Sequence, residues 1–309
     1  MSALDRPGAA AVAERGWLRA HAWLLARRTS QLCILGLFLL GPVTGIWLVK
    51  GNLASSLTLD TLPLSDPYVL LQSLFAGHVP EATALLGALI VLAVYAAIGG
   101  RFYCAWVCPV NPVTDAAQWL RSRLGLQKGW QPRRNTRLWL LAATFAVSLA
   151  TGTIAWEFVN PVSMVFRGLV FGMGFAWTVV AAVFLFDLFV SRRGWCGHLC
   201  PVGAFYGLVG SAALLRVRAD KRAACDDCMD CFAVCPEPQV ITPALKGAAH
   251  GRGPVVLSPD CSNCGRCIDV CSKDVFRFGS RFDTAAWGGL RKAGRAGATD
   301  AASATGIGN

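Results

Sequence analysis

Apolar stretches without a charged side chain dominate the first two thirds of the sequence. Four of them are long enough to cross a bilayer, which takes about 20 helical residues. They cover residues 30–49, 82–100, 138–156 and 168–186, and the fourth can continue past Asp187. Because 54% of the residues are hydrophobic and only 15% are charged, an ordinary soluble protein is excluded. The pattern predicts a mainly α integral membrane protein with four transmembrane helices.

The basic residues sort to one side of the predicted spans. The formal net charge is +11, and Arg is frequent in the N-terminal segment 1–29 and in the loop between the second and third spans. The loop at 50–81 has one basic residue besides His78, and the loop after Trp156 has only Arg167. Since basic residues concentrate in cytoplasmic loops, both termini are expected in the cytoplasm. This sorting accounts for most of the positive charge, so no nucleic-acid partner is expected.

Eight cysteines after the fourth span form two runs with the same spacing, Cys-x2-Cys-x2-Cys-x3-Cys. This spacing is typical of paired four-iron clusters, in which three thiolates of one run bind one cluster and the fourth binds the other. The predicted ligands are Cys225, Cys228, Cys231 and Cys271 for the first [4Fe-4S] cluster, and Cys261, Cys264, Cys267 and Cys235 for the second.

Zinc and disulfides are the alternatives for these eight thiols. Zinc sites use two separated cysteine pairs, so the third cysteine of each run would be surplus. Disulfides need an oxidising compartment, whereas the charge pattern places this region in the reducing cytoplasm. Ser272 follows the last cysteine where Pro is usual, which alters a turn but removes no ligand.

Four more cysteines stand in two Cys-x3-Cys-Pro motifs. Cys104 and Cys108 follow the second span, and Cys196 and Cys200 follow the fourth, so both motifs are expected at the cytoplasmic side. On a helix, an i, i+4 pair presents both sulfurs on one face, which suits a metal, a reversible disulfide or a partner contact. Burial as small apolar side chains is the alternative. His198, inside the second motif, is interpreted as a packing or interface residue.

These features predict a duplicated two-helix unit followed by a small α+β domain of the two-cluster bacterial-ferredoxin type. The expected order is a basic cytoplasmic segment (1–29), a four-helix membrane domain with both Cys-x3-Cys-Pro motifs (30–216), a two-[4Fe-4S] ferredoxin-like domain (217–284) and a disordered tail (285–309).

Four segments carry a resemblance to a known family. They are Cys104-Ala-Trp-Val-Cys108-Pro-Val-Asn, Trp195-Cys196-Gly-His-Leu-Cys200-Pro-Val-Gly, Cys235-Pro-Glu-Pro-Gln-Val, and the run from Cys261 to Cys271 with the Val-Phe-Arg-Phe after it. Over about residues 25–283 the chain resembles the NapH family, the ferredoxin-type membrane component of the periplasmic nitrate reductase system.

The resemblance implies an electron-transfer subunit of a quinol dehydrogenase in the bacterial inner membrane. Electrons from the quinol pool would pass to a NapG-like periplasmic iron–sulfur protein and on to a multihaem or nitrate-reducing acceptor. The spans contain no histidine that could hold a haem, so electrons would cross the membrane through quinone or a partner, or the clusters would serve another pathway. Glu157 and Asp187, near predicted helix ends, are candidates for handling protons, with interfacial solvation as the alternative.

The same residues are also compatible with two other functions. The resemblance extends to assembly factors of the NosR and CcoG types, which carry further periplasmic domains. A redox or metal maturation factor would use the four membrane-proximal thiols to reduce or hand on a metal. A regulatory protein would use them to sense oxidation.

Overall fold

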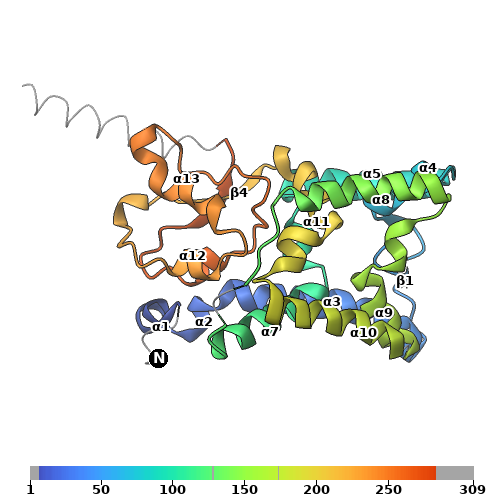
Figure 1. Ribbon diagram of the computed structural model, residues 1–309, viewed down its shortest axis with the longest axis horizontal. Helices are drawn as coiled ribbons and strands as arrows, with labels where there is room; N and C mark the ends of the chain where they lie inside the picture. The colour runs from blue at the N-terminus through green and yellow to red at the C-terminus, as the bar shows by residue number, and fades with distance from the viewer. Residues whose placement is uncertain (1–6, 127–128, 173, 283–309) are drawn as a thin grey trace, which may run out of the picture.

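The computed structural model describes residues 7–126, 129–172 and 174–282 (Figure 1). The tail at 285–309, expected to be disordered, lies outside the described residues. The described residues form α-helices and short strands. The α-helices are α1 Ala9–Arg15, α2 Trp17–Ala20, α3 Ala22–Thr44, α4 Pro67–Phe75, α5 Ala82–Ile98, α6 Phe102–Trp106, α7 Val110–Arg123, α8 Thr136–Thr151, α9 Pro161–Phe171, α10 Gly174–Leu185, α11 Pro201–Val209, α12 Asp230–Val234, α13 Ile241–Lys246 and α14 Arg266–Asp269. The strands are β1 Val49–Gly51, β2 Ser55–Thr58, β3 Leu62–Ser65, β4 Leu215–Arg218 and β5 Arg277–Ser280.

Helix α3 forms from the first apolar stretch. It begins at Ala22 rather than at residue 30, keeps Pro42 in its last turn and ends before Gly45. Within the described part of the chain, α3 is the one helix long and apolar enough to cross a membrane by length and composition. Helices α5, α8 and α9, and α10 with its continuation to Val190, are apolar but shorter. Four membrane crossings therefore stay a proposal, taken up below.

The fourth apolar stretch is not one helix. Helix α9 ends at Gly172, whose φ of +64° is left-handed, and α10 begins at Gly174. A Cβ atom on Gly168 of α9 would lie 3.1 Å from the ring of Trp177 on α10, so the two helices pack closely. The expectation of a continuous helix over 168–186 is wrong, because the chain folds back at Gly172.

The helices stand in two layers (Figure 1). One layer holds α3, α7, α9 and α10, and the other holds α4, α5 and α8. Helix α11 packs on α5 and α8 and buries most of its side chains, among them Tyr206. The cysteine-rich domain lies at one end of the layers, and the sheet containing β1 lies near the other end.

That sheet is an antiparallel meander in the order β1-β2-β3. Val49 pairs with Thr58, and Ser56 pairs with Leu64. Strand β3 lies directly on α5, because a Cβ on Gly87 would come within 3.0 Å of the Pro63 backbone. After β3, the Asp66 side chain accepts a hydrogen bond from the Tyr68 amide, which caps α4 at its N-terminus. The segment between α3 and α5 is therefore a packed part of the helical domain.

The cysteine-rich domain is built around the β4–β5 ribbon. Leu215 pairs with Ser280 and Arg218 with Arg277, which joins the start of the domain to its end. Val217, Ile241 and Phe276 belong to the buried apolar core beneath the cysteine loops. This arrangement confirms the ferredoxin-type part of the predicted fold.

The N-terminal segment joins the two parts of the protein. The Trp23 and Leu24 amides at the start of α3 donate to the two carboxylate oxygens of Asp269 on α14, at 3.0 and 2.9 Å. Arg15 of α1 donates to the backbone oxygen of Asp269 at 2.7 Å and pairs with exposed Asp274. A residue of the cysteine-rich domain thus caps the longest helix of the helical domain.

Candidate functional site

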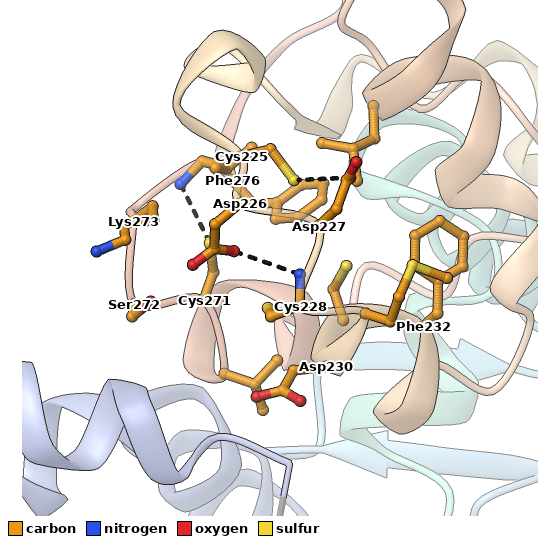
Figure 2. Close-up of a pocket in the computed structure, with 15 residues that line it drawn as sticks. Cys225, Asp226, Asp227, Cys228, Asp230, Phe232, Cys271, Ser272, Lys273 and Phe276 are labelled. Atoms are coloured by element: carbon orange, nitrogen blue, oxygen red, sulfur yellow. Dashed lines mark hydrogen bonds between the residues drawn. The ribbon is translucent and has the colours of Figure 1, made fainter.

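The first predicted ligand set lies around one cavity (Figure 2). Cys225, Cys228, Cys231 and Cys271 all line it. Cys231 is buried and Cys228 is exposed, so this cavity, which we call the distal pocket, is close to the protein surface. Figure 2 also shows Asp226, Asp227, Asp230 and Lys273 around it.

The second ligand set lies around a separate cavity, which we call the proximal pocket. Cys235, Cys261, Cys264 and Cys267 line it, together with Arg266. The structure thus gathers the eight thiols into the same two groups of four that the spacing predicts, including the exchange of the fourth cysteine between runs.

The two ligand loops repeat each other in backbone geometry. Asp227 and Asn263, each two residues after the first cysteine, have φ of 58° and 47°. Met229 and Gly265, two residues later, have φ of 63° and 72°. Asp and Asn tolerate this left-handed region better than most residues, and glycine adopts it freely. Each loop is thereby folded tightly around its thiols before a short helix begins, a shape that suits three ligands of one cluster.

The donor set fits an iron–sulfur cluster. Thiolate sulfur is the ligand that [4Fe-4S] clusters use, and each pocket supplies four cysteines. Such clusters accept and release one electron at a time. The protein's own contribution is the loop geometry and the charges around each pocket.

The proximal pocket adjoins the first Cys-x3-Cys-Pro motif. Trp106, between Cys104 and Cys108, donates its indole N–H to the Asn263 carbonyl oxygen at 3.0 Å. The side-chain amide of Asn263 in turn donates to the Ile98 carbonyl at the end of α5, also at 3.0 Å. The second ligand loop is therefore hydrogen-bonded to the helical domain at the level of this motif.

Two buried arginines connect the second Cys-x3-Cys-Pro motif to the proximal pocket. Arg101 donates to Glu237 at 3.1 Å and to the Cys196 carbonyl at 3.1 Å. Arg137 pairs with Glu237 at 3.4 Å and with Asp260. Glu237 and Asp260 stand next to the ligand cysteines of the second cluster, and both arginines come from the helical domain. No sequence pattern predicts this network, because charged residues at helix ends usually face water.

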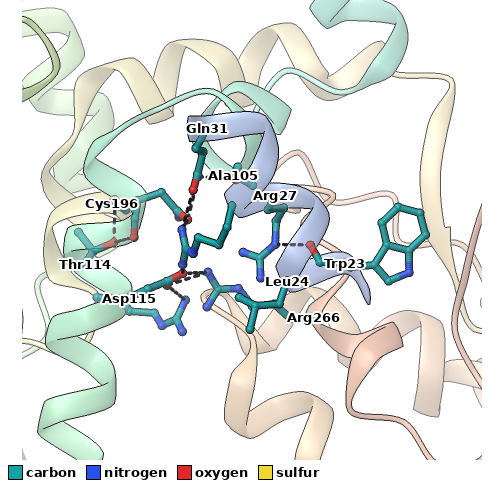
Figure 3. Close-up of polar contacts among 12 residues, drawn as sticks. Trp23, Leu24, Arg27, Gln31, Ala105, Thr114, Asp115, Cys196 and Arg266 are labelled. Atoms are coloured by element: carbon teal, nitrogen blue, oxygen red, sulfur yellow. Dashed lines mark hydrogen bonds and ion pairs between the residues drawn. The ribbon is translucent and has the colours of Figure 1, made fainter. Parts of the chain in front are cut away.

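A second charge cluster surrounds Asp115 of α7 (Figure 3). Arg266, next to the proximal pocket, donates to both Asp115 carboxylate oxygens at 2.7 Å. Arg28 of α3 also pairs with Asp115, and Arg193 lies 3.5 Å away. Burial raises the pKa of the Asp115 carboxyl, but the guanidiniums of Arg266, Arg193 and Arg28 outweigh burial and hold that pKa below its ordinary value.

Arg266 also changes the pKa of a thiol in the proximal pocket. Burial raises the pKa of Cys264, yet the guanidiniums of Arg266 and Arg27 overcome this effect and lower it below its usual range. In the distal pocket, burial and the neighbouring cysteines raise the pKa of Cys231 to about 12. Burial also raises the pKa values of Cys235, Cys261 and Cys267, so the net lowering in the proximal pocket is confined to Cys264.

The four thiols of the Cys-x3-Cys-Pro motifs converge inside the protein. Cys104 lies in α6, Cys108 just after it, Cys196 in a π-helical turn and Cys200 at the start of α11. Burial raises the pKa of all four thiols, and for Cys108, Cys196 and Cys200 the neighbouring thiols of the set raise it further. The structure brings the two motifs together, whereas their position at the cytoplasmic side and their role stay predictions.

The two acidic residues considered for proton handling make structural contacts. Glu157 accepts hydrogen bonds from Asn160 at 2.8 Å and from Ser163 at 3.1 Å. Asp187 accepts from the Trp195 amide at 2.9 Å. His198 lies beside Glu237, in keeping with its interpretation as an interface residue.

Two family models match the chain. One, described as a 4Fe-4S binding domain, covers residues 82–127 and 173–222, and the other, a 4Fe-4S dicluster domain, covers 224–275. The first match falls on the two halves of the helical domain that hold the Cys-x3-Cys-Pro motifs. No solved structure matches.

Curated relatives match nearly the whole chain. A methylamine utilization ferredoxin-type protein, MauN, of Methylorubrum extorquens is 55% identical over 91% of this chain and 97% of its own length. MauN of Paracoccus denitrificans is 58% identical over 88% and 95%. The ferredoxin-type protein NapH of Escherichia coli is 49% identical over 90% and 96%. The chain belongs to the NapH and MauN family of ferredoxin-type iron–sulfur electron-transport proteins.

Proposed function

We propose that this chain is a membrane-bound electron-transfer subunit of a quinol dehydrogenase. In this proposal the apolar helices cross the bacterial inner membrane several times, and both termini and the cysteine-rich domain are cytoplasmic. The distal and proximal pockets each hold one [4Fe-4S] cluster, and electrons from quinol leave one at a time. The observation that carries the proposal is the junction of the proximal pocket with the helical domain through Arg101, Trp106 and Asn263.

The residues of the chain have distinct tasks in this proposal. The eight cysteines of the two pockets hold the clusters. Arg101 and Arg137 keep the second ligand loop against the helices, and Arg266 supplies positive charge beside the proximal thiols. Buried ion pairs hold their geometry strongly once formed, since removing one partner leaves the other charge without compensation.

The proposal has two forms, which differ in the system that finally receives the electrons. The resemblance to NapH implies electron delivery, through a NapG-like protein, towards periplasmic nitrate reductase. The two MauN relatives are 55% and 58% identical, against 49% for NapH of Escherichia coli. The names of these MauN relatives favour methylamine utilization as the system that this chain serves.

Maturation of a partner enzyme is the second candidate function. The four half-buried thiols of the Cys-x3-Cys-Pro motifs favour it, because clusters could deliver electrons to a disulfide or metal held there. Cys104, Cys108, Cys196 and Cys200 are replaced together by Ser, and duroquinol oxidation by native membranes is compared with the activity of the partner enzyme. Loss of quinol oxidation supports the electron-transfer proposal. Normal quinol oxidation with an inactive partner enzyme contradicts it and supports maturation.

A further inference from the structure

A cavity of about 300 Å³ lies inside the helical domain, away from both cysteine pockets. Its walls come from α3, the β1–β3 sheet, α5 and the segment around the first Cys-x3-Cys-Pro motif, and they include Phe38, Leu64 and Val107. We call it the sheet cavity. Its volume is at the lower end of the range for small-molecule sites, which are mostly apolar with a few polar groups that orient the ligand.

The polar groups of the sheet cavity gather around Asp66. Its Oδ1 atom accepts hydrogen bonds from the Tyr206 hydroxyl and from the Tyr68 amide, both at 3.0 Å. Its Oδ2 atom has no partner among the described residues. Tyr95 and Tyr103 also line the cavity, and their rings lie 5.2 and 5.0 Å from the ring of Tyr206. One carboxylate and three phenols therefore border a mostly apolar space, to which the β2–β3 hairpin adds the hydroxyls of Ser56, Thr58 and Ser65.

Two features of the walls suit a lipid-soluble aromatic ligand. Leu37 of α3 lines the cavity and is 38% exposed, so the apolar wall of the cavity extends to the protein surface, where an apolar tail could leave it. Tyr103 and Val107 line the cavity from the segment that also carries Cys104 and Cys108. The same segment reaches the proximal pocket through Trp106.

Building on the proposed function, we infer that the sheet cavity binds the ring of a quinol and that the Asp66 carboxylate accepts its protons. Oxidation breaks the two O–H bonds of the quinol and yields quinone, two protons and two electrons. The protons pass one at a time to Asp66 and then to water, and the electrons are taken singly by one-electron acceptors, the class to which four-iron clusters belong.

The surroundings of Asp66 support this role. Burial raises the pKa of its carboxyl to about 6, while the hydrogen bonds from Tyr68 and Tyr206 act in the opposite direction and Glu157 adds to the rise. A general base with a pKa near the working pH is well placed both to accept and to release a proton. Asp66 directly follows β3 in the chain and is held at the start of α4, so the packed helical domain fixes the position of its carboxylate.

The test uses Asp66→Asn in the full-length protein in native membranes. Asn caps a helix as well as Asp does, so the bond from the Tyr68 amide is kept while the proton acceptor is lost. Duroquinol oxidation is expected to fall about 100-fold, the lower end for loss of a general base. The matched control is Asp60→Asn, since Asp60 lies in the turn between β2 and β3, is 59% exposed and pairs only with Lys50 among the described residues. It should oxidise duroquinol at the wild-type rate.

A binding measurement separates this inference from the proposed function. A photoreactive azidoquinone should label α3, α5 or the β1–β3 sheet, and excess decylubiquinone should prevent labelling. Leu64→Trp, which fills the cavity, should abolish labelling while leaving the iron content unchanged. If the wild type oxidises duroquinol but is labelled elsewhere, and Asp66→Asn matches Asp60→Asn, the sheet cavity is excluded and the proposed function stands. If the wild type oxidises no duroquinol, both are overturned.

Discussion

Replacing Asp115 by Asn should loosen the cysteine-rich domain from the helices. The Asp115 side chain is 14% exposed and balances Arg266, Arg193 and Arg28, so the substitution leaves three largely buried guanidiniums without their shared counter-ion. Removing one partner of a buried ion pair costs about 3–5 kcal/mol. Since about 1.4 kcal/mol corresponds to a tenfold change in an equilibrium constant, the open population should rise roughly 100-fold or more.

Hydrogen exchange measures this opening directly. The Trp23 and Leu24 amides are bonded to Asp269 across the junction, so they exchange when α14 separates from α3. Mass spectrometry of the peptide that contains them should show exchange accelerated roughly 100-fold in Asp115→Asn. Exchange within twofold of the wild type would refute the reasoning that this network holds the junction.

The control is Asp274→Asn at the same junction. Asp274 pairs with Arg15 at 2.6 Å but is 58% exposed, and exposed pairs contribute only about 0–1 kcal/mol. Its effect on exchange should be about fivefold or less.

Because the pKa of Asp115 is lowered on folding, the stabilising effect of Asp115 is complete above the ordinary carboxyl pKa of about 4 and is lost as the pH falls through the lowered value.

Three further predictions follow from the charges and burial of the sites. The proximal cluster, beside Arg266, should have a higher reduction potential than the distal cluster, beside Asp226 and Asp230, in an EPR-monitored redox titration; the reverse order would contradict the electrostatic assignment. Burial raises the pKa of Cys200 to about 12, so iodoacetamide at pH 8 should alkylate it about 1000-fold more slowly than a free cysteine, and rapid labelling of the folded protein would exclude this environment. A reporter enzyme fused after Ser280 should be active only in the cytoplasm, and periplasmic activity would reverse the proposed orientation.

The two cysteine pockets could be predicted from the sequence because the signal is local. Three ligands of each set lie within seven residues, and the exchange of the fourth is a property of the repeated spacing. The left-handed residues at Asp227 and Asn263 then place the loops around the two cavities.

The junction could not be predicted, because its partners are remote in sequence. Asp115 and Arg266 are each ordinary surface residues by type, and only folding brings them together. The start of α3 was missed for the same reason. Arg27 and Arg28 suggested a segment outside the span, whereas Asp269 caps the helix at Trp23 and Asp115 compensates Arg28.

Neither the helix break at Gly172 nor the role inferred for Asp66 could be predicted from the sequence. A glycine inside an apolar stretch is tolerated by a helix, and here the fold-back depends on the packing of Gly168 against Trp177. The Ser65-Asp66-Pro67 segment is typical of a helix N-terminus, and α4 does begin there. Its second property, a carboxylate bordering an apolar cavity, depends on tyrosines from α5, α6 and α11.

The most direct test of the account is the redox state of the clusters after quinol is added. Anaerobic native membranes containing the full-length protein are mixed with duroquinol, frozen and examined by EPR. The account predicts signals of reduced four-iron clusters in the wild type, and their loss when Cys264→Ser removes a proximal ligand or Asp66→Asn removes the proton acceptor. Clusters that dithionite reduces but duroquinol leaves oxidised in the wild type would contradict it.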